Sequence, residues 1–175
     1  MEVSSSCDGK VVSGIKYDNA GKKGGLVVGS NKTRISMYNN VILAMSGRSP
    51  KFGGSTDANV VAHVANNYFW DNTGHSFDVA SGAAVVVEGN YFKANTKPIT
   101  SPIEGSVIMS TASNVNSCSS TLGRACVANT IESNGALASK DSDALTKAKT
   151  IATTYKPSVA KKLAYSTTNW GVGDL

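Results

Sequence analysis

Three runs rich in apolar residues recur along the middle of the chain, and each is followed by a polar turn and a shorter apolar stretch. The runs span residues 34–38, 60–65 and 83–87. The stretches that follow them begin with asparagine and read Asn40-Val41-Ile42, Asn67-Tyr68-Phe69 and Asn90-Tyr91-Phe92. The aligned asparagines are separated by 67 − 40 = 27 and 90 − 67 = 23 residues. A recurrence of this length, with strand-forming residues and a turn residue in every copy, is typical of stacked coils in a solenoid.

Among solenoids, the pattern favours a parallel β-helix. Strands in such a coil lie directly above their counterparts in the next turn, so Val, Ile and aromatic side chains stack into an interior column and need little alternation. We expect the repeated asparagine at a corner of the coil, where its amide can hydrogen-bond an identical amide in the next turn. The alternative is that asparagine recurs here only because it is common in this chain. Leucine-rich repeats and propellers fit less well, because neither the Leu spacing nor a Trp-Asp signature is present.

Cys118 and Cys126 bracket a short polar loop that contains Gly123, and a loop of this kind can fold back so that the two sulfurs meet. We therefore predict a disulfide there, which would stabilise the loop by about 2 to 3 kcal/mol in the chain-entropy model. Disulfides persist outside the cell, so the pair also predicts a secreted protein. Cys7 then has no partner among the three cysteines. It could be a free thiol, form an intermolecular disulfide, or pair with a cysteine that is not in this sequence, and we favour the last. The alternative is a cytosolic protein with three reduced thiols.

The end of the chain follows a helical period. Apolar residues recur at helical spacing between residues 139 and 153, and Pro157 suits the first turn of a second short helix over residues 157–164. Both helices would pack on the outside of the solenoid and shield its apolar surface. We expect one domain over residues 1–175, with coils in 1–110, a disulfide-stapled loop region in 111–137 and a helical tail in 138–175.

Length and charge exclude several classes of protein. The chain has 175 residues and a net charge of +5, which favours approach to a polyanion, but no nucleic-acid-binding motif is present and no nucleic-acid partner is expected. The longest apolar run, residues 83–87, is too short to span a bilayer, so no membrane partner is expected either. The first six residues lack the basic start and apolar middle of a signal peptide. That absence alone would keep the protein inside the cell, whereas the cysteines favour secretion.

Five motifs in order carry a resemblance to a known family. They are Arg48-Ser49-Pro50-Lys51, Val64-Ala65-Asn66-Asn67-Tyr68-Phe69, Gly74-His75-Ser76-Phe77, Val87-Glu88-Gly89-Asn90 and the loop from Cys118 to Cys126. From about Ser5 to its end, the chain resembles the C-terminal half of fungal and oomycete pectin lyases, which belong to the first family of polysaccharide lyases and are right-handed parallel β-helices. The resemblance implies that the family's N-terminal coils are not included and that Cys7 would pair with a cysteine in them. We expect the complete protein to be a monomer, and strand edges left uncovered to promote self-association.

The activity that this resemblance implies is β-elimination in α-1,4-galacturonan, with methyl-esterified pectin preferred. Arg48 would be the base that removes the proton at C5 of a galacturonate unit, and Lys51 would bind the acidic group of the substrate and its enolate-like charge. Arginine holds its proton tightly, so local cations and a dry cleft are needed for an arginine to act as a base. The same cations would stabilise the transition state.

Each of these two assignments has an alternative. Arg48 could be a surface arginine paired with a nearby acid, since structural ion pairs are common. In an ideal strand Lys51 would face away from Arg48, so a bend after Pro50 is needed to bring it round, and residues 52–54 would supply one.

Other polar residues are weaker candidates. His63 and His75 have no third ligand or nucleophile nearby in the sequence, so we predict structural hydrogen bonds from both and no metal site. Asp71, Asp78 and Glu88 could act as paired carboxylates of a hydrolase, but the sequence sets no separation between them. All three rank below Arg48.

Substrate charge and calcium dependence stay open at this point. Pectin lyases usually carry several aromatic residues after the cysteine that resembles Cys7, whereas only Tyr17 is present here, among lysines at positions 10, 16, 22 and 23 that would suit a more anionic polymer. No cofactor is expected from the residues present, but calcium is not excluded, because the residues that decide it in this family fall in the part not included. The alternatives to a pectin lyase are a calcium-dependent pectate lyase, an inactive relative that binds pectic polysaccharide without cleaving it, and a structural or adhesive β-helix.

Overall fold

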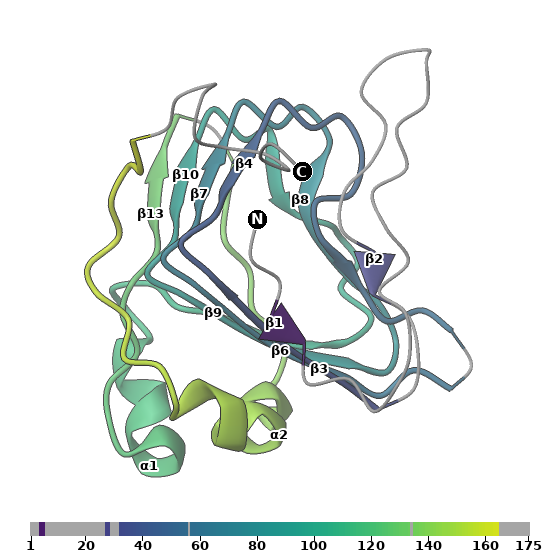
Figure 1. The fold of residues 1–175 in the computed structure, drawn as a ribbon, viewed down its shortest axis with the longest axis vertical. Helices are drawn as coiled ribbons and strands as arrows, with labels where there is room; N and C mark the ends of the chain where they lie inside the picture. The colour runs from purple at the N-terminus through teal and green to yellow at the C-terminus, as the bar shows by residue number, and fades with distance from the viewer. Residues whose placement is uncertain (1–3, 6–26, 29–31, 56, 134, 165–175) are drawn as a thin grey trace.

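The structure is a computed structural model of the chain, and it describes residues 4–5, 27–28, 32–55, 57–133 and 135–164 (Figure 1). Cys7, Tyr17 and the lysines at positions 10, 16, 22 and 23 lie outside the described residues, so the expectations about them stay as they are. Within the described part, no helix has the length and the apolar character needed to cross a bilayer.

The strands form three sheets that enclose a common interior (Figure 1). The first sheet has the order β1 (Ser4–Ser5), β3 (Thr33–Tyr38), β6 (Val60–Ala65), β9 (Ala83–Glu88) and β12 (Ser106–Met109). The second has the order β13 (Thr130–Glu132), β10 (Tyr91–Lys93), β7 (Tyr68–Trp70) and β4 (Val41–Leu43). The third has the order β11 (Lys97–Ile99), β8 (His75–Val79), β5 (Lys51–Phe52) and β2 (Val27–Val28). Apart from the antiparallel pair of β1 with β3, the neighbours are parallel, which confirms the predicted parallel β-helix.

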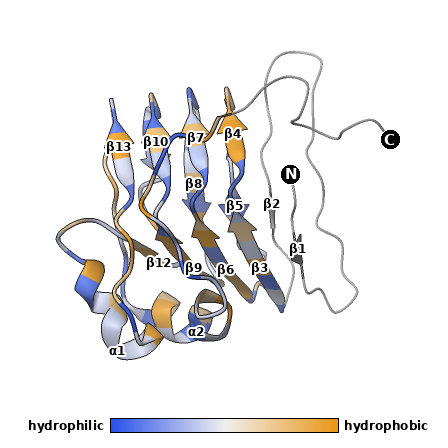
Figure 2. Ribbon diagram, turned by 60° about the vertical axis from the view of Figure 1, so that its left-hand side comes forward, coloured by the Kyte–Doolittle hydropathy of each residue, from blue (hydrophilic) through white to orange (hydrophobic). Residues whose placement is uncertain are grey.

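Equivalent residues of successive coils lie directly above one another. Ile35 pairs with Ala62, Ala62 with Val85, and Val85 with Val107, and all four side chains are buried. In the second sheet the rings of Phe69 and Phe92 stack with their centroids 4.9 Å apart. Figure 2 shows the strands of neighbouring coils side by side in these columns. The predicted interior stacking is confirmed, and burial of this column supplies most of the driving force for folding.

Asparagine side chains form a ladder at the corner between the first and second sheets. Asn40 donates its backbone N–H and its Nδ2 group to Oδ1 of Asn67, at 2.9 and 3.0 Å. Asn67 donates in the same way to Asn90 at 2.9 and 2.9 Å, and Asn90 to Asn129 at 2.8 and 2.9 Å. The four side chains are buried, so each bond satisfies polar groups that water cannot reach. The predicted asparagine ladder is confirmed and gains a fourth member, Asn129.

At this corner, the residue before each of the first three ladder asparagines, Asn40, Asn67 and Asn90, has left-handed backbone geometry. Asn39, Asn66 and Gly89 have φ values of 56°, 56° and 63°. Asparagine and glycine tolerate this geometry better than other residues. Each corner therefore uses two residues, one that turns the backbone and one that bonds the next coil.

Helices cover the outer face of the first sheet, as Figure 1 shows. They are the 3-10 helix η1 (Val115–Cys118), α1 (Ser119–Leu122) and α2 (Asp143–Ala152). Val61, Ala84 and Val86 of the sheet pack against Leu122 and Leu145 of the helices. The helix predicted over residues 139–153 is confirmed, but it begins at Asp143. Lys140 cannot be helical, because its N–H and C=O both bond the backbone of Val107, at 2.9 and 3.0 Å.

The second predicted helix, over residues 157–164, is wrong. This segment contains no helix. Its backbone bonds the side chain of Asn66 instead, with the N–H of Ser158 donating to Asn66 Oδ1 at 2.9 Å and Asn66 Nδ2 donating to the carbonyl of Ser158 at 2.7 Å. Farther along, Lys162 Nζ lies 2.6 Å from Glu132 Oε2 on β13. Long-range bonds to the solenoid thus replace the local bonds that a helix would make.

Candidate functional site

The outer face of the third sheet brings together Arg48, Lys51 and Asp78. Arg48 Nε lies 2.8 Å from Asp78 Oδ2, and Lys51 Nζ lies 3.9 Å from the same oxygen. The two residues that the sequence singled out as base and substrate-binding cation therefore meet at one carboxylate. We refer to Arg48, Lys51 and Asp78 as the outer charge cluster.

The strands on either side decide where these side chains point. Asp78 stands between Phe77 and Val79, both of which are buried in the interior, so its carboxylate is directed outward. Its N–H donates to the carbonyl of Pro50 at 3.0 Å, and its register partner in β5 is Lys51. Backbone pairing between successive coils thus fastens residues 50 and 51 to Asp78.

Strand alternation does not separate Arg48 from Lys51, because only Lys51 belongs to a strand. Residues 46–50 lie before β5 and have no regular structure, so Arg48 is free of the alternation that an ideal strand would impose. In the segment expected to supply a bend, Gly53 and Gly54 have left-handed backbone geometry, with φ values of 78° and 89°. A side chain at Gly54 would approach Lys51 Nζ to 3.2 Å, so this glycine leaves room for the lysine.

Solvent reaches the three members unequally. The side chain of Arg48 is 54% exposed, against 23% for Lys51 and 17% for Asp78. The guanidinium is therefore accessible to a bound polymer, while the carboxylate lies deeper, on the strand. Two cations around one anion can bind an acidic or ester group and stabilise negative charge that develops on it.

The two histidines behave differently. His63 makes the predicted structural hydrogen bonds, with its Nδ1 2.7 Å from the hydroxyl of Tyr38 and its Nε2 2.8 Å from Glu88 Oε1. His75 begins β8, and its Nδ1 is buried without a hydrogen-bond partner in the described part of the chain. The structural hydrogen bond predicted for His75 is therefore not made at this atom.

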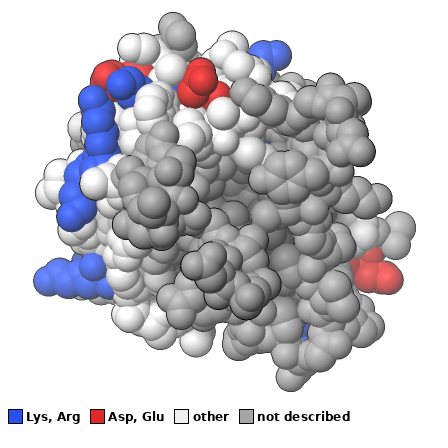
Figure 3. Space-filling view, turned by 45° about the horizontal axis from the view of Figure 1, so that its top comes forward, with Lys and Arg blue, Asp and Glu red and all other residues white. Residues whose placement is uncertain are grey.

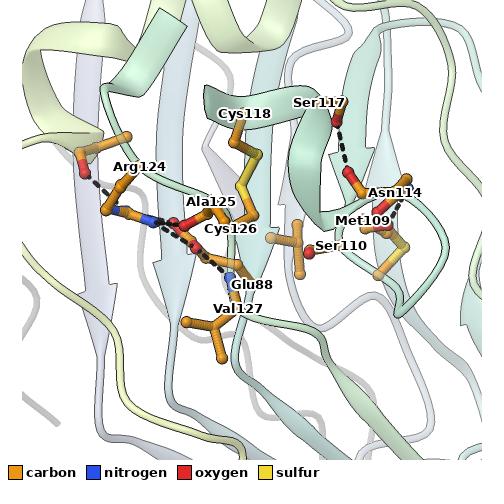
Figure 4. Close-up of a disulfide and its surroundings, with 12 residues drawn as sticks. Glu88, Met109, Ser110, Asn114, Ser117, Cys118, Arg124, Ala125, Cys126 and Val127 are labelled. Carbon is orange, nitrogen blue, oxygen red and sulfur yellow. Dashed lines mark hydrogen bonds and ion pairs between the residues drawn. A yellow bond between two sulfur atoms is a disulfide. The ribbon is translucent and has the colours of Figure 1, made fainter. Parts of the chain in front are cut away.

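A second, buried cluster surrounds Glu88, beside the predicted disulfide (Figure 4). Cys118 and Cys126 are bonded, with their Cα atoms 5.5 Å apart, which confirms that prediction. Arg124, in the loop between them, donates to both oxygens of Glu88, at 2.7 and 2.9 Å. The N–H of Val127 also donates to Glu88, at 2.9 Å. We refer to Glu88, Arg124 and His63 as the inner charge cluster.

The pKa of Glu88 reflects two opposing effects. Burial desolvates the carboxylate and acts to raise its pKa, but hydrogen bonds from His63, Arg124 and Val127 outweigh burial and lower the pKa to about 2. The carboxylate is therefore ionised at neutral pH and fully used in holding the loop. Glu88 and Asp78 belong to different sheets and bind different cations, so they do not form the catalytic carboxylate pair considered from the sequence.

The sequence analysis did not place Asp78 beside Arg48 and Lys51. A signal was present: Asp78 follows Lys51 by 78 − 51 = 27 residues, the same interval that separates Asn40 from Asn67. Residues one repeat apart lie above one another in a solenoid, so this interval alone places the carboxylate beside the lysine.

Other polar groups lie on the second sheet. Lys93 and Lys162 approach Glu132 to 4.0 and 2.6 Å, and Tyr91 donates to the same carboxylate at 2.5 Å. The hydrogen bond from Lys162 is the main cause that lowers the pKa of Glu132. Figure 3 shows Lys and Arg side chains along the left margin of its view, on the side where β13 and the C-terminal segment lie in Figure 1. Basic charge is therefore not confined to the outer charge cluster.

In the part of the chain that the structure describes, no group of three or more His, Cys, Asp or Glu side chains is arranged to hold a metal ion.

Comparison with known proteins gives a consistent result. The chain matches no protein-family model. It is 39% identical over 145 residues to a probable pectin lyase A of Aspergillus fumigatus, a match that covers 82% of this chain and 35% of that protein. It is 37% identical over 142 residues to a probable pectin lyase D of Emericella nidulans, covering 80% and 34%, and 37% identical over 144 residues to a probable pectin lyase F of Aspergillus niger, covering 81% and 29%. The chain thus spans about a third of the length of the curated relatives it matches. The chain forms a parallel β-helix. Its sequence similarity to pectin lyases, at 39% identity over 82% of its own length for the first of these relatives, shows that it belongs to the pectin lyase-like family.

Proposed function

We propose that this chain carries the catalytic base of a pectin lyase, which cleaves α-1,4-galacturonan by β-elimination and prefers methyl-esterified pectin. The observation that carries the proposal is the convergence of Arg48 and Lys51 on the outer face of the third sheet, where the guanidinium is open to solvent. The names of the relatives support the same substrate class.

The proposed step uses the terminal nitrogens of Arg48. One of them, in its neutral form, takes the proton from C5 of a galacturonate unit. The electron pair of the C5–H bond forms the C4=C5 double bond, and the C4–O bond breaks with its pair on the glycosidic oxygen, which takes a proton from water. Lys51 binds the carboxyl or ester group on C5 and stabilises the negative charge that spreads onto it. Arg48 then returns its proton to solvent.

The composition of the outer charge cluster supports the preference for esterified substrate. Asp78 already pairs with Arg48 and lies near Lys51, so its negative charge reduces the attraction of the cluster for a free carboxylate. A methyl ester carries no charge and avoids this repulsion. The Cys118–Cys126 disulfide supports a secreted protein, since such bonds persist outside the cell.

Product formation tests the proposal. The purified chain is incubated with highly methylated pectin and with polygalacturonate, each with calcium or with a chelator, and the ultraviolet absorbance of the unsaturated uronate is followed. We expect product from methylated pectin in the presence of chelator, no product from Arg48→Ala, and unchanged product from Arg34→Ala. Arg34 is a matched control because it lies on the first sheet and bonds the backbone carbonyls of Thr33 and Asn59. Full activity in Arg48→Ala would refute the proposal.

Binding of pectic polysaccharide without cleavage is the second candidate function. The observation that favours it is the group of lysines beside Glu132, away from the outer charge cluster. It predicts no product on either polymer, binding that survives Arg48→Ala, and binding that is lost in high salt because exposed charges are screened.

A further inference from the structure

We infer that Gly74 is a positioning residue for Arg48, because the loop that carries the arginine can lie against the next coil only where that coil has no side chain. This loop spans residues 45–50 and lies between β4 and β5. The inference rests on the proposed function of Arg48, and it adds the residue that allows the loop to place the base.

The loop is fastened to the next coil on both sides of the arginine. Before it, the carbonyl of Met45 accepts a hydrogen bond from the N–H of Thr73 at 2.9 Å. After it, the N–H of Ser49 donates to the carbonyl of His75 at 3.1 Å. Only residues 46–48 lie between these two bonds, and the last of them is the arginine. The backbone around the base is therefore held by the coil on which it lies.

Gly74 stands between the two bonded residues of that coil and touches the middle of the loop. A Cβ atom at this position would lie 2.4 Å from the carbonyl oxygen of Ser46 and 2.5 Å from that of Gly47. Cβ atoms do not come within 3.0 Å of other heavy atoms, so a methyl group here would separate the two segments by 3.0 − 2.4 = 0.6 Å or more. Both oxygens belong to the backbone, so no side-chain rotation relieves the contact. The displaced residues come immediately before Arg48.

A shift of the loop would move the base relative to the rest of the site. Arg48 belongs to no strand and its side chain is 54% exposed, so the loop backbone decides where the guanidinium lies. Lys51 belongs to β5 and is held in register with Asp78 of β8. The lysine would therefore stay in place while the arginine moves. A displacement of about 1 Å at a reacting group can lower a rate about 100-fold.

Gly105 offers a matched control. A Cβ atom there would meet backbone oxygens as closely, that of Ala80 at 2.5 Å and that of Ala83 at 2.8 Å. Neither Gly74 nor Gly105 has left-handed backbone geometry, so an alanine at either position is opposed by the close contact alone. The atoms nearest to Gly105 belong to residues 79–83 and not to the loop. Gly105→Ala thus carries a similar steric cost without displacing Arg48.

The first test measures hydrogen exchange of the Ser49 N–H in the full chain by NMR and does not require turnover. The N–H of Tyr91, which is hydrogen-bonded on the second sheet, serves as the reference for opening of the whole solenoid. Relative to this reference, Ser49 should exchange roughly tenfold faster in Gly74→Ala than in the unaltered chain, because the displaced loop weakens its hydrogen bond. In Gly105→Ala the relative exchange should change by less than about twofold. Equal relative exchange in Gly74→Ala and the unaltered chain would overturn the inference.

The second test measures elimination on methylated pectin. Gly74→Ala should lower kcat roughly 10- to 100-fold because the base is displaced, while KM changes by less than roughly threefold because the sheet and Lys51 stay in place. Gly105→Ala should leave both constants unchanged, and an equal loss of kcat in the two variants would contradict the inference. If the unaltered chain makes no product, the proposed function fails, and exchange at Ser49 still decides whether Gly74 seats the loop. If the chain is active and Gly74→Ala is equally fast, the inference alone fails.

A second variant covers the case in which Gly74→Ala does not fold. The N–H of Met45 donates to Oδ1 of the buried Asn72 at 2.9 Å, so Asn72→Ala loosens the same loop without adding an atom. Its control is Asn95→Ala, which removes a buried asparagine bonded to Ser76 instead of the loop. Asn72→Ala should lower kcat roughly 10-fold more than Asn95→Ala does. Equal kcat in these two variants would show that the seat of the loop does not place the base.

Discussion

The inner and outer charge clusters use the same chemistry in opposite surroundings. Each cluster has one carboxylate near two nitrogen-bearing side chains. Glu88 contacts Arg124 and His63 in the inner cluster. Asp78 lies near Arg48 and Lys51 in the outer cluster. The side chain of Glu88 is 0% exposed and that of Arg124 20%, whereas Arg48 is 54% exposed. Ion pairs cut off from water depend on each partner to avoid an unpaired buried charge, while exposed pairs contribute little to stability. Burial thus separates a structural cluster from one that is available for chemistry.

The largest expected effect is on activity and concerns the outer charge cluster. Arg48→Ala should reduce the rate of elimination at least about 1,000-fold, or roughly 4 kcal/mol in barrier height, because the base is removed. Its unfolding free energy should change by less than about 1 kcal/mol, since the Arg48 side chain is 54% exposed. Product absorbance and urea unfolding measure the two quantities. Loss of stability comparable to that of an inner-cluster variant would show that Arg48 is structural.

Removal of the inner carboxylate should give the largest loss of stability. Glu88→Ala leaves Arg124 and His63 without their partner and should lower the unfolding free energy by about 3 to 5 kcal/mol. Urea denaturation curves of the variant and the unaltered chain, fitted with one shared m-value, measure the change. Asp78→Ala is the matched variant from the outer cluster, and we expect it to lose less than about 1 kcal/mol. Equal losses from the two variants would contradict the distinction between the clusters.

Acid should act mainly on the inner charge cluster. The folded-state pKa of Glu88 is about 2, below its ordinary value of 4.5. A carboxyl whose pKa is lowered by folding adds stability above its unfolded pKa, and that stability is lost as pH falls toward the folded value. We therefore expect the unfolding free energy to decrease by about 3 kcal/mol between pH 4.5 and pH 2. Thermal unfolding across this range tests it, and Glu88→Gln should show a flatter dependence.

The disulfide should have a somewhat smaller effect. The double variant Cys118→Ala with Cys126→Ala should lose about 2 to 3 kcal/mol, because the loop that carries Arg124 is no longer closed. Reducing agent added to the unaltered chain should produce a similar loss in urea denaturation. If reduction leaves stability unchanged, Arg124 and Glu88 hold the loop without the covalent bond.

Some features of this protein follow from the repeat alone. Strands β3, β6 and β9 and the ladder through Asn40, Asn67 and Asn90 were predictable, because one local pattern recurs and stacking satisfies it in every coil. Asn129 was not found, since it follows Asn90 by 129 − 90 = 39 residues. The disulfide loop lies within that interval and hides the recurrence.

Other features depend on contacts between distant residues. The segment 157–164 has a helical start signal, but the side chain of Asn66 binds its backbone and keeps it out of a helix. Asp78 meets Arg48 only because parallel register places one coil on the next. The sequence by itself determined the stacked coils, the corner residues and the short disulfide loop, because each rests on local propensity or a short interval. Tertiary structure alone decided which charges are buried with Glu88 and that Arg48 stays open to solvent, since exposure depends on what the rest of the chain covers.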